Sequence, residues 1–457
     1  MKGHGNWSYC PYKPPLFDSG DIYICRIAPD QNAIHFEWTG DACEYSVFCR
    51  KRDDGQFALC GKTKGNEFDI KELCGDTDYE FYVENGCKKS RVRLARTGKP
   101  IGTVVNYLHP DDKVYSFSGG YLCSPSLVRH PDGFLLASMD VYALGAPQNL
   151  TLIFRSDDDG KSWHYVSELM PSFWGKLFIH KGELYMLSCN TEYGDLLIGR
   201  STDGGKTFCA PTVLLRGLGG KSGQCGVHKN PQNVFVHNGR IYETLEWGNW
   251  ANKEFGHAAM VMSCSVDDDL LVAENWSFSE PVKFDHFAPE IADLQKPVMT
   301  IEGTLTLDPS GKLLNIMRFG KREYALAYEV DTKNPEAPLK YHSIKKMGVA
   351  FSKFMIKFDE ISGKYYTVAS KLYEGCPDYA RNYLVLMSSL DLEEWKIEKE
   401  LFDFRQFDPE KVGLQYIDFS FDGDDIIYLS RTAINAAASF HDSNYSTFHR
   451  IENFRKI

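Results

Sequence analysis

One eight-residue motif occurs twice in this 457-residue chain and constrains its fold more than any other feature. The copies are S-D-D-D-G-K-S-W at residues 156–163 and S-T-D-G-G-K-T-F at residues 201–208, 45 residues apart. In each copy an aspartate can accept hydrogen bonds from the turn backbone, a glycine tolerates positive φ, and an aromatic residue returns the chain to an apolar core. The motif therefore predicts one β-hairpin turn used twice, which indicates a repeat architecture.

Further hairpin signals run from about residue 107 to the C-terminus. The turn sequences are H-P-D-G at His130, H-K-G-E at His180, H-N-G-R at His237, D-P-S-G at Asp308, I-S-G-K at Ile361 and F-D-G-D-D at Phe421. Weaker copies of the repeated motif precede Trp276 and Trp395. Two hairpins per unit of about 45–55 residues is the spacing of a propeller blade. Since long helical patterns are missing, residues 107–457 are predicted to form an all-β, six-bladed β-propeller, with seven blades as the alternative.

Residues 20–98 have a different texture, with short alternating segments separated by turns. This rhythm predicts a small antiparallel β-sandwich with Trp38 in its core. The run E-L-C-G-D-T-D-Y-E-F-Y-V resembles the fibronectin type III pattern, in which Tyr79 would be the corner tyrosine. No catalytic cluster is evident in this region, so a spacer or docking module is expected.

Composition excludes several classes of function. The net charge is −11 and no long Lys/Arg run occurs, which argues against nucleic acid or an anionic membrane as a partner. No apolar window is long enough to span a membrane. The 13 cysteines include no C-x-x-C pair, so neither a zinc site nor a redox pair is indicated, and no other metal or cofactor is expected. The start M-K-G-H-G-N-W-S-Y-C lacks an apolar signal region, so a cytoplasmic protein is expected, or a secreted one if a leader had been removed.

The repeated motif is similar to the Asp-box, or BNR repeat, of the sialidase superfamily. That resemblance implies a propeller in which three arginines grip a substrate carboxylate. It further implies a tyrosine nucleophile with a glutamate partner, and an aspartate as acid and base. The chemistry is consistent with these residue types, because guanidinium groups hold a carboxylate bidentately and a tyrosine beside a glutamate can lose its proton.

Three runs match the family's segments. The run I-E-G-T-L-T-L-D-P-S-G-K-L-L-N-I-M-R implies Glu302 and Arg318, and A-R-N-Y-L-V-L-M-S-S-L-D-L-E-E-W implies Arg381. The run V-G-L-Q-Y-I-D-F-S-F-D-G-D-D implies Tyr416 as the nucleophile. We expect these four side chains, distant in sequence, to converge at the mouth of the propeller.

Two family residues are missing from the expected places. Cys123 stands where the first arginine is expected, and the loop A-L-G-A-P-Q-N-L-T-L before the first Asp-box has no carboxylate. A conventional sialidase is therefore not expected, and activity on ordinary sialosides should be weak or absent. Other polar residues at strand ends and in loops are candidates to fill the gap. They are His228 and Asp140 for catalysis, and Glu246, His441 and Asn444 for substrate binding.

These observations predict a carbohydrate-active enzyme that acts on an oligosaccharide or glycoconjugate. The favoured reading is an exo-acting glycosidase of sialidase type that removes a terminal sialic or uronic acid. One alternative is a uronate-directed lyase, such as a rhamnosyl-glucuronate lyase, which needs a neutralised carboxylate and a base near C5 that an arginine with a tyrosine or histidine could supply. A second alternative is a non-catalytic glycan-binding propeller.

Overall fold

The computed structural model describes residues 6–7, 22–41, 44–219, 223–252, 256–283, 300–319, 323–349 and 351–457. Its regular structure consists of strands and two short 3-10 helices, η1 (Ala273–Asn275) and η2 (Phe454–Lys456). No described helix is long and apolar enough to cross a membrane. The expected start of the sandwich at residue 20 lies outside the described residues.

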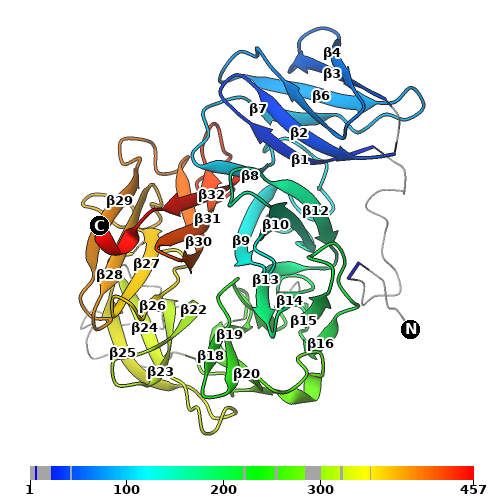
Figure 1. Ribbon diagram of the computed structural model, residues 1–457. Helices are drawn as coiled ribbons and strands as arrows, with labels where there is room; N and C mark the ends of the chain where they lie inside the picture. The colour runs from blue at the N-terminus through cyan, green and yellow to red at the C-terminus, as the bar shows by residue number, and fades with distance from the viewer. Residues whose placement is uncertain are drawn as a thin grey trace.

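The N-terminal part of the chain folds into two antiparallel sheets, drawn in blue in Figure 1. One sheet contains β1 (Tyr23–Pro29), β2 (Ile34–Thr39) and β5 (Glu67–Ile70). The other contains β4 (Ala58–Thr63), β3 (Tyr45–Lys51), β6 (Asp78–Glu84) and β7 (Arg93–Arg96). Trp38 is buried between the sheets as expected, and the Tyr79 hydroxyl accepts a hydrogen bond of 2.9 Å from the backbone N–H of Cys74. This is the geometry expected of a corner tyrosine.

The rest of the chain forms six sheets arranged in a ring (Figure 1). The first blade contains β9 (Tyr121–Arg129), β10 (Leu135–Tyr142), β11 (Leu150–Ser156) and β12 (His164–Leu169). The second contains β13 (Phe173–His180), β14 (Glu183–Cys189), β15 (Leu196–Ser201) and β16 (Thr212–Leu215). The third contains β17 (Gly226–His228), β18 (Phe235–His237), β19 (Arg240–Gly248), β20 (His257–Ser265) and β21 (Trp276–Phe278). The fourth contains β22 (Thr300–Leu307), β23 (Leu313–Phe319), β24 (Tyr324–Glu329) and β25 (Lys340–Lys346). The fifth contains β26 (Lys357–Asp359), β27 (Lys364–Ser370), β28 (Tyr383–Ser389) and β29 (Lys396–Asp403).

The sixth blade closes the ring with strands from both ends of the propeller segment. It contains β30 (Gly413–Asp422), β31 (Asp425–Ala433), β32 (Tyr445–Ile451) and, as its outermost strand, β8 (Thr103–Tyr107). The prediction of an all-β propeller is confirmed, with six blades. Because β8 pairs with β32, the propeller begins upstream of residue 107, where the turn pattern first became visible in the sequence. An outermost strand carries no hairpin motif of its own, so the sequence pattern does not reveal it.

Four inner strands carry the same irregularity near their first residues. Each contains a register shift and one non-glycine residue in the left-handed region. These residues are Ser124 in β9 (φ 51°), Trp174 in β13 (φ 55°), Glu302 in β22 (φ 58°) and Tyr416 in β30 (φ 55°). A bulge redirects side chains relative to the alternation of a regular strand, and non-glycine residues at positive φ concentrate at functional sites. The repeated bulge therefore marks one end of the propeller axis.

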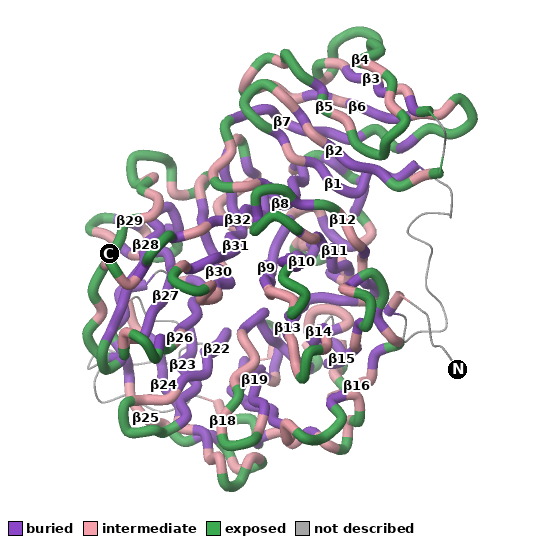
Figure 2. The backbone as a smooth tube through the Cα atoms, viewed as in Figure 1, coloured by how far each residue is buried: buried purple, intermediate pink, exposed green. Residues whose placement is uncertain are grey.

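The inner strands of neighbouring blades are also joined to one another by side-chain hydrogen bonds. Ser126 accepts a hydrogen bond from the backbone N–H of Leu177 at 2.9 Å, and Thr304 accepts one from Ile356 at 3.2 Å. Figure 2 shows that the inner strands are largely buried, while exposure is concentrated in the loops and outer edges. These contacts hold neighbouring blades in register around the bulges.

Asp418 of β30 completes this arrangement near the axis. Its Oδ2 accepts a hydrogen bond of 2.7 Å from the backbone N–H of Leu127 and pairs with the Nζ of Lys176 at 2.5 Å. Both charged side chains are almost fully buried. An ion pair that is this deeply buried is stable only if both charges stay paired, so it fixes how blades one, two and six meet.

Both copies of the eight-residue motif form hairpin turns, as expected, and each lies between the third and fourth strands of its blade. Asp158 accepts hydrogen bonds from the backbone N–H of Ser162 (2.9 Å) and from its hydroxyl (2.7 Å), and Asp203 does the same with Thr207 (2.8 and 2.6 Å). Since each motif occupies the same place in adjacent blades, the two turns lie on the same face of the ring. That face is opposite to the one that carries the bulges, because strands of a blade alternate in direction.

Gly160 in the first copy of the motif should be far less tolerant of a side chain than other turn glycines. Its φ is +87°, and an added Cβ would lie 2.0 Å from the Cε1 of Phe448 in blade six. Gly133 has a similar φ of +94° but nothing within 4 Å, so Gly133→Ala is a matched control for backbone strain alone. We expect Gly160→Ala to lower the free energy of unfolding by about 1–3 kcal/mol more than the control, as overpacking does. Equal losses in denaturant titrations of the two variants would contradict this packing role.

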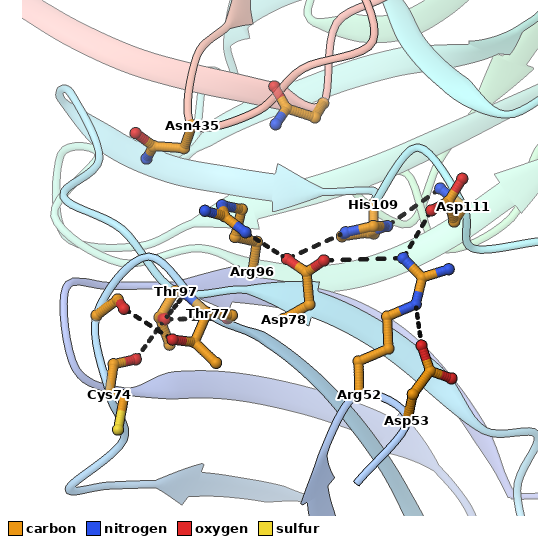
Figure 3. Close-up of polar contacts among 12 residues, drawn as sticks. Arg52, Asp53, Cys74, Thr77, Asp78, Arg96, Thr97, His109, Asp111 and Asn435 are labelled. Carbon is orange, nitrogen blue, oxygen red and sulfur yellow. Dashed lines mark hydrogen bonds and ion pairs between the residues drawn. The ribbon is translucent and has the colours of Figure 1, made fainter.

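The sandwich contacts the segment that follows β8 through polar side chains (Figure 3). Arg52 donates to Asp111 at 2.7 Å, and Asp78 accepts from Arg96 at 2.9 Å and lies 3.6 Å from His109. The Arg26 guanidinium, buried in β1, donates to two backbone carbonyls of β8. The sandwich is thus joined to the strand that closes the propeller.

Candidate active site

Glu302, Arg318 and Tyr416 lie together at the end of the axis marked by the bulges. The Tyr416 hydroxyl donates a hydrogen bond of 2.7 Å to Oε1 of Glu302, and Arg318 Nη1 donates one of 2.7 Å to Oε2. The same Nη1 lies 3.4 Å from the Tyr416 oxygen. Burial raises the pKa of Tyr416, and the Glu302 charge raises it further, so the phenol stays protonated at neutral pH until a base takes its proton.

Glu302 is the carboxylate that accepts the hydrogen bond of this phenol. Burial alone would raise its pKa, but the charge of Arg318 and its hydrogen bond outweigh this effect and lower it. Glu302 is therefore ionised and accepts the Tyr416 proton in its hydrogen bond. A phenol held by an ionised carboxylate is an activated nucleophile or a general acid.

Two further arginines flank the same tyrosine ring. The Cζ of Arg381 lies 5.7 Å from the ring centre of Tyr416, and that of Arg431 lies 5.1 Å from it. Arg381 comes from the loop before β28 and donates to the backbone carbonyl of Phe351 at 2.8 Å and to Gln415. Arg431 lies on β31. Blades four, five and six thus each supply one guanidinium.

The three guanidiniums hold more positive charge than their surroundings neutralise. Arg318 pairs with Glu302, but Arg381 and Arg431 have no carboxylate within 4 Å among the described residues. The Nε atoms of all three are buried without a hydrogen-bond partner. Burial, and then repulsion by the other two arginines, lower the pKa of Arg381 to about 9. Buried unpaired charge is costly, and a bound anion would offset this cost.

His228 and Glu246 form a second dyad next to the first. His228 Nδ1 lies 2.6 Å from Glu246 Oε2, and Glu246 Oε1 accepts a hydrogen bond of 2.8 Å from the backbone N–H of Glu302. The His228 ring packs against Trp174, with ring centres 4.4 Å apart. No partner is found for His228 Nε2 among the described residues, so this nitrogen is available to a ligand. Glu246 is fully buried and contacts both His228 and the backbone of the bulge residue Glu302, and its expected role in substrate binding stays a prediction.

Asp140 and Asn444, two candidates from the sequence, have supporting positions. Asp140 is fully buried and accepts hydrogen bonds from Thr151 at 2.5 Å and from the backbone N–H of Gly175 at 3.3 Å. Burial raises its pKa to about 7. Asn444 is fully buried as well and bonds the backbone of Ile434. The catalytic role expected of Asp140 and the binding role expected of Asn444 stay predictions.

His441 lies at the edge of the cluster. Its Nδ1 is 3.2 Å from Arg431 Nη2, and its ring centre is 5.3 Å from that of Tyr142. Burial and the Arg431 charge lower the pKa of His441 to about 4, so it is neutral at neutral pH. The neutral imidazole of His441 contacts Arg431 without adding a charge, which is compatible with a place beside a bound ligand.

Arg431 is the residue that the sequence reasoning missed. It is opposite Gln415 in the β30–β31 pairing, just as Arg318 is opposite Ile301 in the β22–β23 pairing. In each case the next residue of the inner strand is the bulge residue. An alignment of the β30–β31 hairpin with the β22–β23 hairpin, based on their inner strands, would have found Arg431. The Arg431 charge also reaches Cys123, where it offsets part of the burial that raises the pKa of this thiol to about 12. The third guanidinium, that of Arg431, thus comes from blade six, which neighbours the blade that carries Cys123.

One group of potential metal ligands occurs among the described residues, on the sandwich. His35, Glu37 and Glu67 bring ligand atoms within 4.8 Å of one another. Arg26 Nη1 already pairs with Glu37 at 2.8 Å and supplies the positive charge there. The three potential ligands lie on β2 and β5 of the sandwich, away from the inner strands of the propeller, so they are not part of the candidate active site.

His257 should make the protein acid-sensitive. It accepts or donates a 2.9 Å hydrogen bond with the Tyr193 hydroxyl, and burial, followed by the charges of His228 and Arg318, lowers its pKa to about 2. The unfolded chain takes up this proton below about pH 6.5 while the folded chain does not, so stability falls as pH falls through that range. His257→Gln should flatten the slope of the unfolding free energy between pH 6.5 and 5 by up to about 1.4 kcal/mol per pH unit. His237→Gln, on a surface hairpin, is the control, and identical slopes for the wild type and His257→Gln would contradict the expectation.

The fold and these groups together define a class of protein: a β-propeller with a tyrosine, a glutamate and three buried arginines at one end of its axis. No family model and no curated protein matches the chain. Among solved structures it is similar to an α-L-arabinanase of Penicillium chrysogenum solved with arabinobiose, at a TM-score of 0.51 and 14% identity over 78% of this chain and 100% of that chain. An ulvan lyase of family PL25 covers 95% of each chain at a TM-score of 0.44 and 11% identity. The arabinanase supports the same fold for this chain, and the identities carry no more than that.

Proposed function

We propose that this protein is an exo-acting glycosidase that removes a terminal sugar bearing a carboxylate, with Tyr416 as nucleophile. The observation that carries this is the set of three buried guanidiniums around one tyrosine that already donates to an ionised glutamate. The arginines match a sialic or uronic acid carboxylate in charge and geometry. The propeller fold shared with an enzyme solved with arabinobiose is in keeping with a carbohydrate-active enzyme.

A tyrosine suits this substrate class for an electrostatic reason. A carboxylate nucleophile would be repelled by the substrate's own carboxylate, whereas a phenol is neutral until its proton passes to Glu302. Arg318 bridges Glu302 and Tyr416, so substrate binding and nucleophile activation share one guanidinium. The resemblance to sialidases rests on the same residues.

The test is a screen of the purified protein against aryl glycosides of sialic acid, glucuronic acid and neutral sugars. We expect turnover only with a substrate that carries a carboxylate, and retention of anomeric configuration in the NMR spectrum of the first product. A fluorinated slow substrate should label Tyr416, read by peptide mass spectrometry. Turnover of neutral glycosides with equal efficiency, or inversion, would contradict the proposal.

The His228–Glu246 dyad favours a second candidate, a uronate-directed lyase. Glu246 orients His228 so that Nε2 can take the C5 proton of a uronate while the arginines neutralise its carboxylate. Tyr416 would then protonate the leaving oxygen. The two functions differ in their products, because elimination leaves an unsaturated uronate that absorbs in the ultraviolet and hydrolysis does not. Unsaturated products from uronate-containing oligosaccharides would favour the lyase over the glycosidase.

A further inference from the structure

The loop that precedes the first Asp-box lacks a carboxylate, yet the structure brings one to it from the next blade. Glu192 lies in the loop between β14 and β15 of blade two, and its Oε2 accepts a hydrogen bond of 3.2 Å from Nε2 of Gln148. Gln148 belongs to the carboxylate-free loop of blade one and is itself buried, with φ 51°. A long-range contact therefore fixes Glu192 against the loop from which an acid is missing.

Glu192 interacts electrostatically with two groups beside the candidate site. Its charge contributes to the raised pKa of Tyr142, and the charge of His228 partly offsets the effect of burial on the pKa of Glu192. Tyr142 in turn lies 5.5 Å from the Cζ of Arg431, which lies 5.1 Å from the Tyr416 ring. Glu192 thus belongs to the side of blades one and two, with Tyr142 between it and Arg431 in this chain of interactions, whereas Tyr416 comes from blade six.

The surroundings of Glu192 suit an acid better than a structural ion pair. No arginine, lysine or histidine nitrogen is found within 4 Å of its carboxylate among the described residues, and the side chain is half-buried rather than enclosed. Burial raises its pKa, and the His228 charge and the Gln148 hydrogen bond offset this only in part. A carboxyl that keeps its proton closer to neutrality and remains accessible can donate it to a substrate.

We propose that Glu192, supported by Gln148, is the general acid and base of the reaction that begins at Tyr416. This inference rests on the proposed glycosidase function. In the first step protonated Glu192 gives its proton to the glycosidic oxygen as the bond from that oxygen to the anomeric carbon breaks. The Tyr416 oxygen forms its bond to the anomeric carbon, and the Tyr416 proton passes to Glu302.

The second step reverses these transfers. Glu192, now a carboxylate, takes a proton from a water molecule whose oxygen bonds to the anomeric carbon. The bond between that carbon and Tyr416 breaks, and Glu302 returns its proton to the phenol oxygen. The free sugar leaves, and every group has regained its starting protonation state.

The test compares Glu192→Gln on two substrates that differ only in leaving group. On an alkyl glycoside, whose leaving oxygen needs a proton, kcat/KM should fall about 10²–10⁴-fold. On a nitrophenyl glycoside, whose leaving group departs unaided, kcat/KM should fall less than about tenfold, because only the proton donation is lost. Added azide should restore kcat on the nitrophenyl substrate and yield a glycosyl azide, and the alkaline limb of the pH profile should disappear. Glu183→Gln is the matched control, since Glu183 lies on the same blade and bonds Tyr185 and Arg200.

Each other outcome overturns the inference in a recognisable way. Equal losses on both substrates, no loss on either, or an unchanged alkaline limb would remove Glu192 from this role while leaving the glycosidase intact. Turnover of neither substrate by the wild type, or unsaturated products, would refute the proposed function and this role with it. Gln148→Leu should reproduce a milder form of the same leaving-group dependence, whereas a uniform loss would mark Gln148 as structural.

Discussion

Tyr416→Phe is expected to lower kcat by about 10³-fold or more while the melting temperature stays within a few degrees of the wild type. The change removes one oxygen and keeps the ring that Arg381 and Arg431 flank. It deletes the atom that would attack the anomeric carbon, and leaves Glu302 with its partner Arg318. Steady-state kinetics on an aryl glycoside with a carboxylate, together with thermal unfolding, measure both expectations.

A matched control exists elsewhere in the propeller. Tyr185 on β14 also donates to a glutamate, Glu183, at 3.3 Å, and that glutamate is held by Arg200 at 2.8 Å. Tyr185→Phe therefore removes the same kind of hydrogen bond from the same kind of cluster outside the candidate site. We expect it to leave kcat unchanged. Full activity of Tyr416→Phe, or parallel losses in both variants, would show that Tyr416 is not the nucleophile.

Arg431→Met should cost about 10²–10³-fold in kcat/KM on a substrate with a free carboxylate. On the methyl ester of that substrate, which has no charge for the guanidinium to bind, the same change should cost little. The difference between the two substrates isolates the charge interaction, as a double-mutant cycle does. Because Arg431 has no carboxylate partner within 4 Å among the described residues, removing it should not destabilise the fold.

Two results would decide against this carboxylate grip. An equal loss on acid and ester would mean that Arg431 supports the site only through His441. A large drop in melting temperature would point to a structural role. Arg200→Met, at the control cluster of blade two, should change neither ratio nor rate.

The bulges connect these predictions to the fold. Glu302 and Tyr416 both have positive φ on inner strands, a conformation that costs non-glycine residues about 1–3 kcal/mol. Contacts from neighbouring blades maintain this strained conformation. One of them is the hydrogen bond that the Glu246 carboxylate accepts from the Glu302 N–H. In a regular strand the side chains of Glu302 and Tyr416 would point in other directions. The strained conformation turns them toward one another.

Much of the fold could be predicted because its signals are local. Each copy of the motif prescribes a turn within eight residues, through an aspartate (Asp158 or Asp203), the glycine after it and an aromatic residue that returns the chain to the core. The structure forms both turns with the same hydrogen bonds. The outermost strand of blade six was not predicted, since β8 has no turn beside it and pairs with a strand more than 300 residues away. Ring closure is a property of the whole propeller.

The candidate site divides in the same way. The sequence by itself determined the strands and hairpins, and the order of Glu302, Arg318, Arg381 and Tyr416 along them, because these follow from local pattern and family-like motifs. Only the tertiary structure decided that Arg431 stands near Cys123, that Glu192 reaches Gln148, and that Asp140 is enclosed. The physical reason is that a strand's alternation fixes which face a residue occupies only until a bulge shifts it, and contacts between blades depend on how the closed ring brings their edges together.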